Sequence, residues 1–206
     1  MTIGNVQFDL KLTFLIIIST ILPMLDYYNH RFTATKAYDR VILYFIIPIL
    51  IIYFLFKESP AKYGFTFGNW KAGLTYVLIG CVGMAIILWF VARQPGMQQY
   101  YTARAPSEVR RLIYLTGVDL FGWEFIWRGL MLFAFARYFG PGPAIFLQAV
   151  PFAFMHLGKP EIETLSTIFG GAAFGFVAWQ SGSFVYPWLI HWFIASFTQL
   201  IAIGRL

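Results

Sequence analysis

The chain has 206 residues and a mean hydropathy of +0.68, with 59% hydrophobic and only 12% charged residues, whereas soluble domains are about half apolar and about a quarter charged. This composition excludes an ordinary soluble domain and predicts an all-α, polytopic transmembrane helical bundle. The net charge of +6 comes from basic residues scattered singly between apolar stretches, which indicates contact with a lipid bilayer and no nucleic acid partner.

Seven apolar segments follow one another along the chain, separated by polar or Pro- and Gly-containing connections. We expect them at residues 12–25, 41–56, 74–91, 112–139, 144–157, 163–179 and 184–203. The predicted bundle therefore has about seven spans, with six to eight as the range. We place N-terminal transmembrane segments in residues 1–60 and the core of the protein in residues 61–206. Lys and Arg are too evenly spread between the segments to predict the orientation in the membrane.

The fourth segment contains two charged side chains, Glu124 and Arg128. Because they are four residues apart, a helix places them on nearly the same face. A charge in hydrocarbon costs from about 2.5 to more than 10 kcal/mol, so such groups usually face a bundle interior or a watery cavity. A structural ion pair and a functional site are both open at this point. Asp119, one turn before Trp123, is predicted at a solvated helix end.

Two histidines lie in other apolar segments, His156 near the end of the fifth and His191 in the seventh. A lone histidine in an apolar helix is more often a packed core residue than a ligand. Two histidines and Glu124, however, are most simply accommodated in one shared polar pocket. Such a set suits general acid and base catalysis, and it is also a common zinc ligand set. Candidate hydrogen-bonding neighbours of the same pocket are Gln148, Ser196 and Gln199.

Three motifs in three segments carry a family resemblance: Glu124-Phe-Ile-Trp-Arg128, Phe152-Ala-Phe-Met-His156, and His191 after a Gly-Ser turn and a proline. They resemble the motifs of the CPBP family, the CAAX-prenyl and bacteriocin-processing intramembrane proteases, also called the Abi family. Members carry Glu-Glu-x-x-x-Arg, Phe-x-x-x-His and His-x-x-x-Asn or His-x-x-x-Asp on separate transmembrane helices. The resemblance covers about residues 60 to 200.

The sequence departs from the family pattern at two positions. Trp123 stands where family members carry the first glutamate of the pair, which is usually taken as the base, and Ala195 stands where they carry Asn or Asp. Either Glu124 has taken over the role of the base, or the protein is a degenerate member that binds without cutting.

The resemblance implies an intramembrane endopeptidase that hydrolyses a peptide bond of a membrane-associated protein or peptide. Its site residues would be Glu124, His156, His191 and Arg128. We expect Glu124 to accept a proton from water, His156 to orient that water, and His191 to donate to the oxyanion. No cofactor is expected in this scheme, because a glutamate beside a permanent cation is a poor metal ligand. Zinc held by Glu124, His156 and His191 is the alternative.

Two other functions compete with this hypothesis. One is a membrane scaffold or immunity protein that keeps the family fold without its chemistry. The other is a small transporter with an intramembrane charge relay, although the internal repeat that this class often shows is not evident. For the protease, the resemblance implies an integral protein of a prokaryotic plasma membrane.

Overall fold

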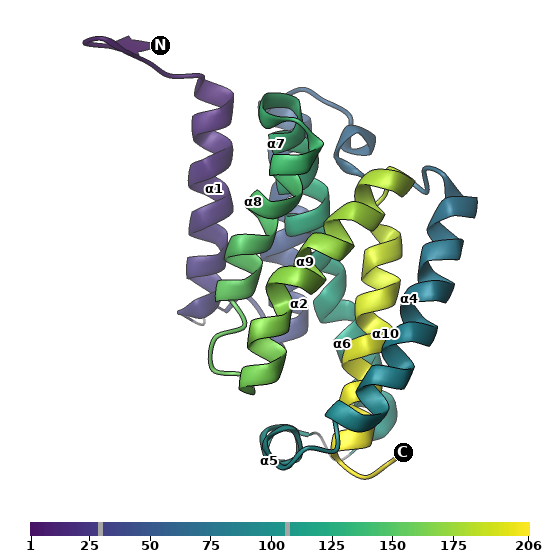
Figure 1. The fold of residues 1–206 in the computed structure, drawn as a ribbon. Coiled ribbons are helices and arrows are strands. Elements are labelled where there is room, and N and C mark those ends of the chain that lie inside the picture. Colours follow the sequence, from purple (N-terminus) through teal and green to yellow (C-terminus); the bar gives the residue numbers. More distant parts are fainter. Residues whose placement is uncertain (29–30, 106–107) are drawn as a thin grey trace.

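The computed structural model describes residues 1–28, 31–105 and 108–206, and most of them lie in helices packed side by side (Figure 1). A short antiparallel hairpin of β1 (Thr2–Ile3) and β2 (Val6–Gln7) precedes the first helix. The helices in chain order are α1 (Leu10–Tyr27), α2 (Lys36–Val41), η1 (Ile42–Ile46), α3 (Ile47–Leu50), η2 (Ile51–Leu55), η3 (Pro60–Tyr63), α4 (Trp70–Val91), α5 (Pro95–Thr102), α6 (Val109–Glu124), η4 (Phe125–Met131), α7 (Leu132–Phe139), α8 (Pro141–Phe154), α9 (Glu161–Ser181) and α10 (Val185–Ala202).

All seven predicted apolar segments are helical, which confirms the all-α polytopic bundle. Five helices of the described residues are long and apolar enough to cross a membrane: α1, the helix Lys36–Leu55, α4, α9 and α10. The predicted count of about seven spans is higher because two segments fall short of these criteria. Helix α8 has only 14 residues, and the continuous helix through residues 109–139 carries Asp119, Glu124 and Arg128 within its apolar part.

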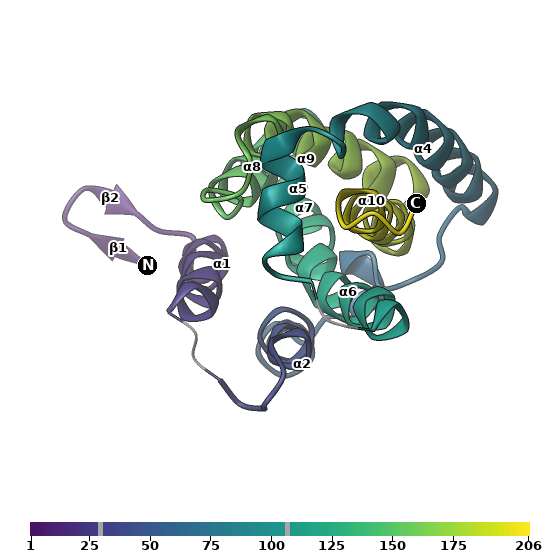
Figure 2. The same cartoon turned by 90° about the horizontal axis from the view of Figure 1, so that it is seen from below.

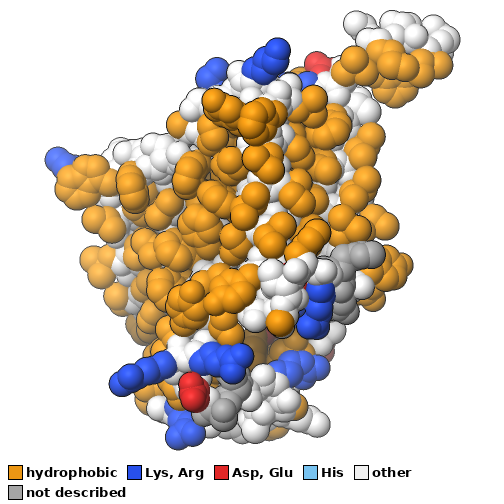
Figure 3. All heavy atoms as spheres, turned by 180° about the vertical axis from the view of Figure 1, so that it is seen from behind, with side chains coloured by type: hydrophobic (Ala, Val, Ile, Leu, Met, Phe, Trp, Pro, Cys, Tyr) orange, Lys and Arg blue, Asp and Glu red, His pale blue; other side chains and the backbone are white. Residues whose placement is uncertain are grey.

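The surface of the bundle is that of an integral membrane protein. Figure 3 shows one face, on which hydrophobic side chains cover the middle and Lys and Arg side chains lie toward the two ends. On α4, the apolar side chains of Leu78, Ile79 and Phe90 are all exposed. Because water would not favour so large an apolar surface, we conclude that lipid covers it.

The helix through residues 109–139 carries the most buried stretch of the chain. Every residue of η4 is buried, and π-helical turns of this kind often occur at functional sites. Helix α6 lies between α2 and α10 (Figure 2). Gly122 allows α2 to approach closely, because a Cβ atom there would lie 2.5 Å from the carbonyl oxygen of Arg40.

Helix α1 stands at the edge of the bundle (Figures 1 and 2), and charged side chains join it to the other helices near both of its ends. Near its start, Lys11 pairs with Glu58, which also binds Arg137 of α7. Near its end, the Asp26 carboxylate accepts hydrogen bonds from Arg40 of α2. The first cluster therefore links α1 to α7, which is distant in sequence, and the second links α1 to α2, the next helix along the chain.

The predicted boundary between residues 1–60 and residues 61–206 stays a prediction. Leu22 and Tyr44 from the first part and Trp127 from the second belong to one hydrophobic core. Helices on both sides of the boundary thus share buried apolar contacts.

Candidate active site

Glu124 and Arg128 form a fully enclosed ion pair. They lie one turn apart, at the end of α6 and in η4, and Arg128 Nη1 is 3.2 Å from Glu124 Oε1. Both side chains are 0% exposed. Charges removed from water need partners within the protein, because the desolvation of each ion costs several kcal/mol. The structure thus brings together the two charges that the sequence places on one helix face.

His191 of α10 binds the same carboxylate. Its Nδ1 atom lies 2.6 Å from Glu124 Oε1, so that one oxygen serves both the imidazole and the guanidinium. A carboxylate accepts hydrogen bonds, so we assign the hydrogen to His191 Nδ1, and a neutral ring then presents the lone pair of Nε2 on its other side. In serine hydrolases a carboxylate holds the catalytic imidazole in the same way.

His156 lies in the turn that follows α8. Its Nδ1 atom is 2.8 Å from the carbonyl oxygen of Phe152. Because a carbonyl oxygen can only accept, Nδ1 is the donor, and a neutral His156 also presents a lone pair at Nε2. The Phe152 ring packs against the imidazole, with 4.5 Å between the ring centroids. Gly158 has a φ of 89°, which lets the chain turn after His156.

Further contacts hold the guanidinium of Arg128 in place. Its Nη2 atom donates to the carbonyl oxygen of Gly171 at 3.4 Å, and its guanidinium carbon lies 4.0 Å from the centroid of the Phe152 ring. Gln148 Nε2 donates to the same Gly171 oxygen at 2.9 Å. Gln148, which we predicted beside the site, therefore shares a backbone partner with Arg128.

Two cavities meet at the histidines. The first, of about 630 Å³, lies between α4, α9 and α10 and is mainly apolar. The second, of about 270 Å³, has a polar and charged lining. The side chains that line both are Tyr101, His156, Lys159, His191 and Ala195. Glu124 and Arg128 line neither cavity. The two histidines are thus the predicted site residues that face open space, and Glu124 is enclosed behind His191.

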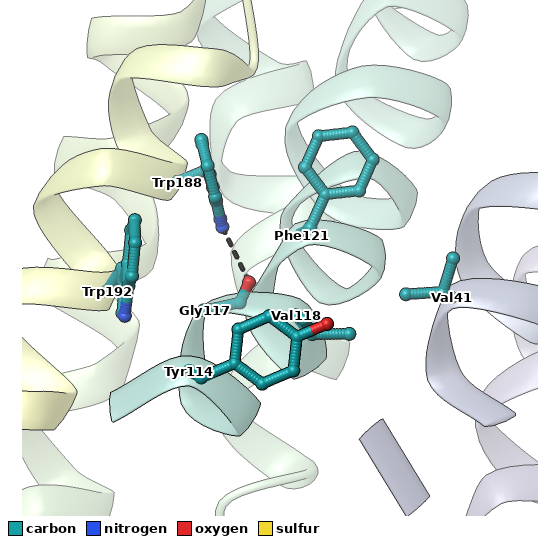
Figure 4. A pocket seen from close by; sticks show the side chains of 7 residues that line it. All are labelled: Val41, Tyr114, Gly117, Val118, Phe121, Trp188 and Trp192. Atoms are coloured by element: carbon teal, nitrogen blue, oxygen red, sulfur yellow. Dashed lines mark hydrogen bonds between the residues drawn. The ribbon is translucent and has the colours of Figure 1, made fainter. Parts of the chain in front are cut away.

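A third cavity, of about 310 Å³, shares no lining residue with the other two (Figure 4). Its lining is almost entirely apolar, and Trp188 Nε1 donates to the carbonyl oxygen of Gly117 at 2.9 Å. A Cβ atom at Gly117 would lie 2.6 Å from the Trp192 ring, so glycine is what lets that ring pack against α6. This cavity offers packing between helices and no groups for hydrolysis.

Residues 106–197 match the family model described as type II CAAX prenyl endopeptidase Rce1-like. This segment belongs to the CAAX endopeptidase family. The match contains Glu124, Arg128, His156 and His191, and it confirms the family that the order of the motifs predicts. At the general level, the match supports a protease. Neither a search of curated proteins nor a search of solved structures found a match.

Both departures from the motifs of CAAX endopeptidases lie beside the histidines. The buried Trp123 ring has its centroid 4.5 Å from the guanidinium carbon of Arg40 and 5.8 Å from the centroid of the His156 ring. A bulky ring therefore lies beside His156 at the position where the family carries its first carboxylate. Ala195 lines both cavities, one turn after His191 on α10.

The structure corrects the prediction for Asp119. Its side chain is not at a freely solvated helix end, because Arg40 Nη1 donates to its Oδ2 at 2.8 Å, and only 25% of the side chain is exposed. Asp119 instead lines the polar cavity. Arg40 is far away in the sequence, so no local pattern indicated this pair.

The other sequence-predicted neighbours of the site differ in their contacts. Gln199 lines the polar cavity and donates to the Ala195 carbonyl oxygen at 3.1 Å. Within the described residues, the buried hydroxyl of Ser196 has no hydrogen-bond partner.

The sequence analysis did not predict Tyr101 and Lys159, which line both cavities. The one signal for Lys159 is its place three residues after His156 in a Gly- and Pro-containing turn.

The predicted zinc ligands are not assembled. Among the described residues, no three His, Cys, Asp or Glu side chains lie close enough together to hold a metal ion. Glu124 Oε1 already binds both Arg128 and His191. This donor geometry does not fit zinc shared by Glu124, His156 and His191, so we derive no step through a metal.

Proposed function

We propose that the protein is an intramembrane endopeptidase that hydrolyses a peptide bond of a membrane-associated protein or peptide. The observation that carries this proposal is the pair of histidines that line both cavities, His156 from the turn after α8 and His191 from α10. In each ring Nδ1 is engaged, His156 with Phe152 and His191 with Glu124, which leaves Nε2 available. Two fixed imidazoles beside a cavity are suited to hold and deprotonate a water molecule.

In this proposal, His191 is the general base. Its Nε2 lone pair accepts a proton from water, and the carboxylate of Glu124 stabilises the imidazolium through Nδ1. Glu124 has no direct access to either cavity, so its role differs from that in our sequence-based hypothesis. It acts through His191 instead of taking the proton from water itself. Arg128 is a positioning residue, because it donates to Glu124 Oε1 and lines neither cavity.

His156 orients the same water molecule in the proposed reaction. Its neutral Nε2 accepts a hydrogen bond from the O–H group of the water that His191 does not deprotonate. The water oxygen then bonds to the scissile carbonyl carbon, and the electron pair of the C=O π bond moves to the carbonyl oxygen. When the C–N bond breaks, the departing nitrogen takes the proton from His191. One water molecule is consumed, and both histidines return to their neutral forms.

The two cavities suggest how a substrate would lie. The apolar cavity adjoins helices with lipid-facing surfaces and suits an apolar segment, whereas the polar cavity suits hydrated backbone and polar side chains. A membrane-associated polypeptide that crosses from one cavity to the other would pass the histidines. We further propose a prokaryotic plasma membrane as the location and a reaction without a cofactor.

A cleavage assay with the full-length protein in liposomes tests the proposed function. The probe is a pool of quenched-fluorescent peptides attached to an acyl anchor. We expect cleavage by the wild type and a loss of about 100- to 10,000-fold in His156→Ala, the range for loss of an acid–base group. Trp192→Phe, in the third cavity, serves as the control and should cleave like the wild type. Activity retained in His156→Ala would overturn the proposal, and an inactive wild type would favour a scaffold or immunity protein.

A further inference from the structure

The proposed reaction leaves one charge without a partner. When water adds to the scissile carbonyl, its oxygen becomes negative and needs a hydrogen-bond donor or a cation. Neutral His156 and His191 present lone pairs at Nε2 and cannot donate from that atom. Arg128 is enclosed and lines neither cavity. A further side chain must therefore supply the positive charge.

Lys159 lines both the apolar and the polar cavity, as the two histidines do. It follows His156 in the same turn, and its backbone N–H donates to the carbonyl oxygen of His156 at 3.2 Å. The turn thus couples the position of Lys159 to that of His156.

The ammonium group of Lys159 is held in place and keeps donors to spare. Its Nζ atom lies 2.6 Å from Glu163 Oε1 on α9, and Tyr101 of α5 donates to Glu163 Oε2, also at 2.6 Å. An ammonium has three N–H donors. One is directed at Glu163, so two remain for a group in the cavities.

The other cations of the polar cavity are less suitable. Arg40 is engaged by two carboxylates, Asp26 and Asp119. Arg104 donates to the carbonyl oxygen of Tyr100 and its guanidinium carbon lies 3.9 Å from the centroid of that residue's own ring. Neither arginine lines the apolar cavity. Lys159 is therefore the cation common to both cavities.

We infer that Lys159 is a further catalytic residue that donates a hydrogen bond from Nζ to the carbonyl oxygen as water adds to the scissile carbon. The inference rests on the proposed peptidase function. The bond between the water oxygen and the carbon forms, the π electrons move to the carbonyl oxygen, and His191 takes the proton of the water. Lys159 stays protonated throughout and stabilises the negative oxygen.

The competing explanation is structural. Lys159 and Glu163 are four residues apart, and their ion pair joins the turn to α9. If that were the whole role of Lys159, removing either partner would have the same consequence. A matched pair of variants separates the two explanations, because Lys159→Met removes the ion pair and the cation, whereas Glu163→Gln removes the ion pair alone.

The test measures kcat and KM of full-length protein in liposomes with the acyl-anchored peptide pool. We expect Lys159→Met to lose about 100-fold in kcat with little change in KM, because the hydrogen bond strengthens only in the transition state. Glu163→Gln should lose less than about fivefold, the effect of a partly exposed ion pair. Lys159→Arg keeps the positive charge and should recover part of the loss.

Equal losses in Lys159→Met and Glu163→Gln would overturn the inference and leave the proposed function intact. A Lys159→Met effect confined to KM would also overturn it. A wild type that cleaves none of the peptides would overturn the proposed function and this inference together. Thermal unfolding of each variant in detergent provides the control for folding.

Discussion

The charged groups of this protein fall into two kinds of environment. At the site, Glu124 and Arg128 are enclosed and bind each other and His191. Near the ends of α1, Arg40 and Glu58 each bridge side chains from several helices while remaining partly exposed. Both arrangements consist of acids, bases and hydrogen bonds, but they differ in access to water.

The difference in access to water distinguishes charged groups that join helices from charged groups that serve the proposed site. The clusters near the ends of α1 join neighbouring helices, and water can compensate when one contact is lost. The enclosed pair has no such compensation, and within the described residues Glu124 Oε2 and Arg128 Nε lack hydrogen-bond partners. Well-packed apolar side chains often stabilise a protein as much as a buried ion pair does. The pair is therefore better explained by what it does for His191 than by stability.

The largest expected effect on stability comes from breaking the enclosed pair. Arg128→Met leaves the Glu124 charge buried without its cation and should lower the free energy of unfolding by about 3–5 kcal/mol. The double variant Glu124→Leu/Arg128→Met removes both charges and should recover most of this loss, yet cleave no peptide. Thermal unfolding in detergent and the cleavage assay measure the two effects. A double variant as unstable as Arg128→Met would show that the pair itself holds the fold.

The sequence was sufficient for the enclosed pair but not for its surroundings. The four-residue spacing of Glu124 and Arg128 fixes their relation on a helix, and their charge in an apolar segment predicts a role. That His191 contacts Glu124 while His156 binds Phe152 depends on how α8 and α10 pack, which no local pattern encodes. The same holds for the exclusion of Glu124 from both cavities.

The sequence also did not predict the contacts of cations with side chains from other helices. Arg40 reaches Asp119 and Trp123 only because Gly122 lets α2 approach α6. The position of Lys159 depends on the turn at Gly158, which has a positive φ angle. Such positions follow from tertiary packing, whereas the apolar segments follow from composition and length alone.

A smaller, pH-dependent effect is expected at the Glu58 cluster. Burial alone would raise the pKa of Glu58, but hydrogen bonds from Lys11, Arg137 and Tyr63 outweigh it and lower the pKa from 4.5 to about 2. A lowered pKa in the folded state means that the ionised group stabilises the fold above about pH 4.5. This contribution is lost as the pH falls from 4.5 toward 2.

Thermal unfolding between pH 6 and pH 2 compares the wild type with Glu58→Gln. The wild type should unfold at the higher temperature at pH 6, and the difference should vanish near pH 2. Glu163→Gln, which removes a carboxylate from another partly exposed ion pair, is the control. A difference between wild type and Glu58→Gln that is constant across this range would contradict the role of the Glu58 charge.

The smallest expected effect concerns metal. Glu124 Oε1 is occupied by Arg128 and His191, and the described residues bring no three candidate ligands together. We therefore expect no stoichiometric zinc in protein purified in detergent, and no change in cleavage after treatment with a chelator. Metal analysis of the wild type and of His156→Ala is the measurement. Zinc bound at one equivalent in the wild type and lost in His156→Ala would require the helices to rearrange around a metal. In that case a metal ion, and not His191, would activate the water molecule.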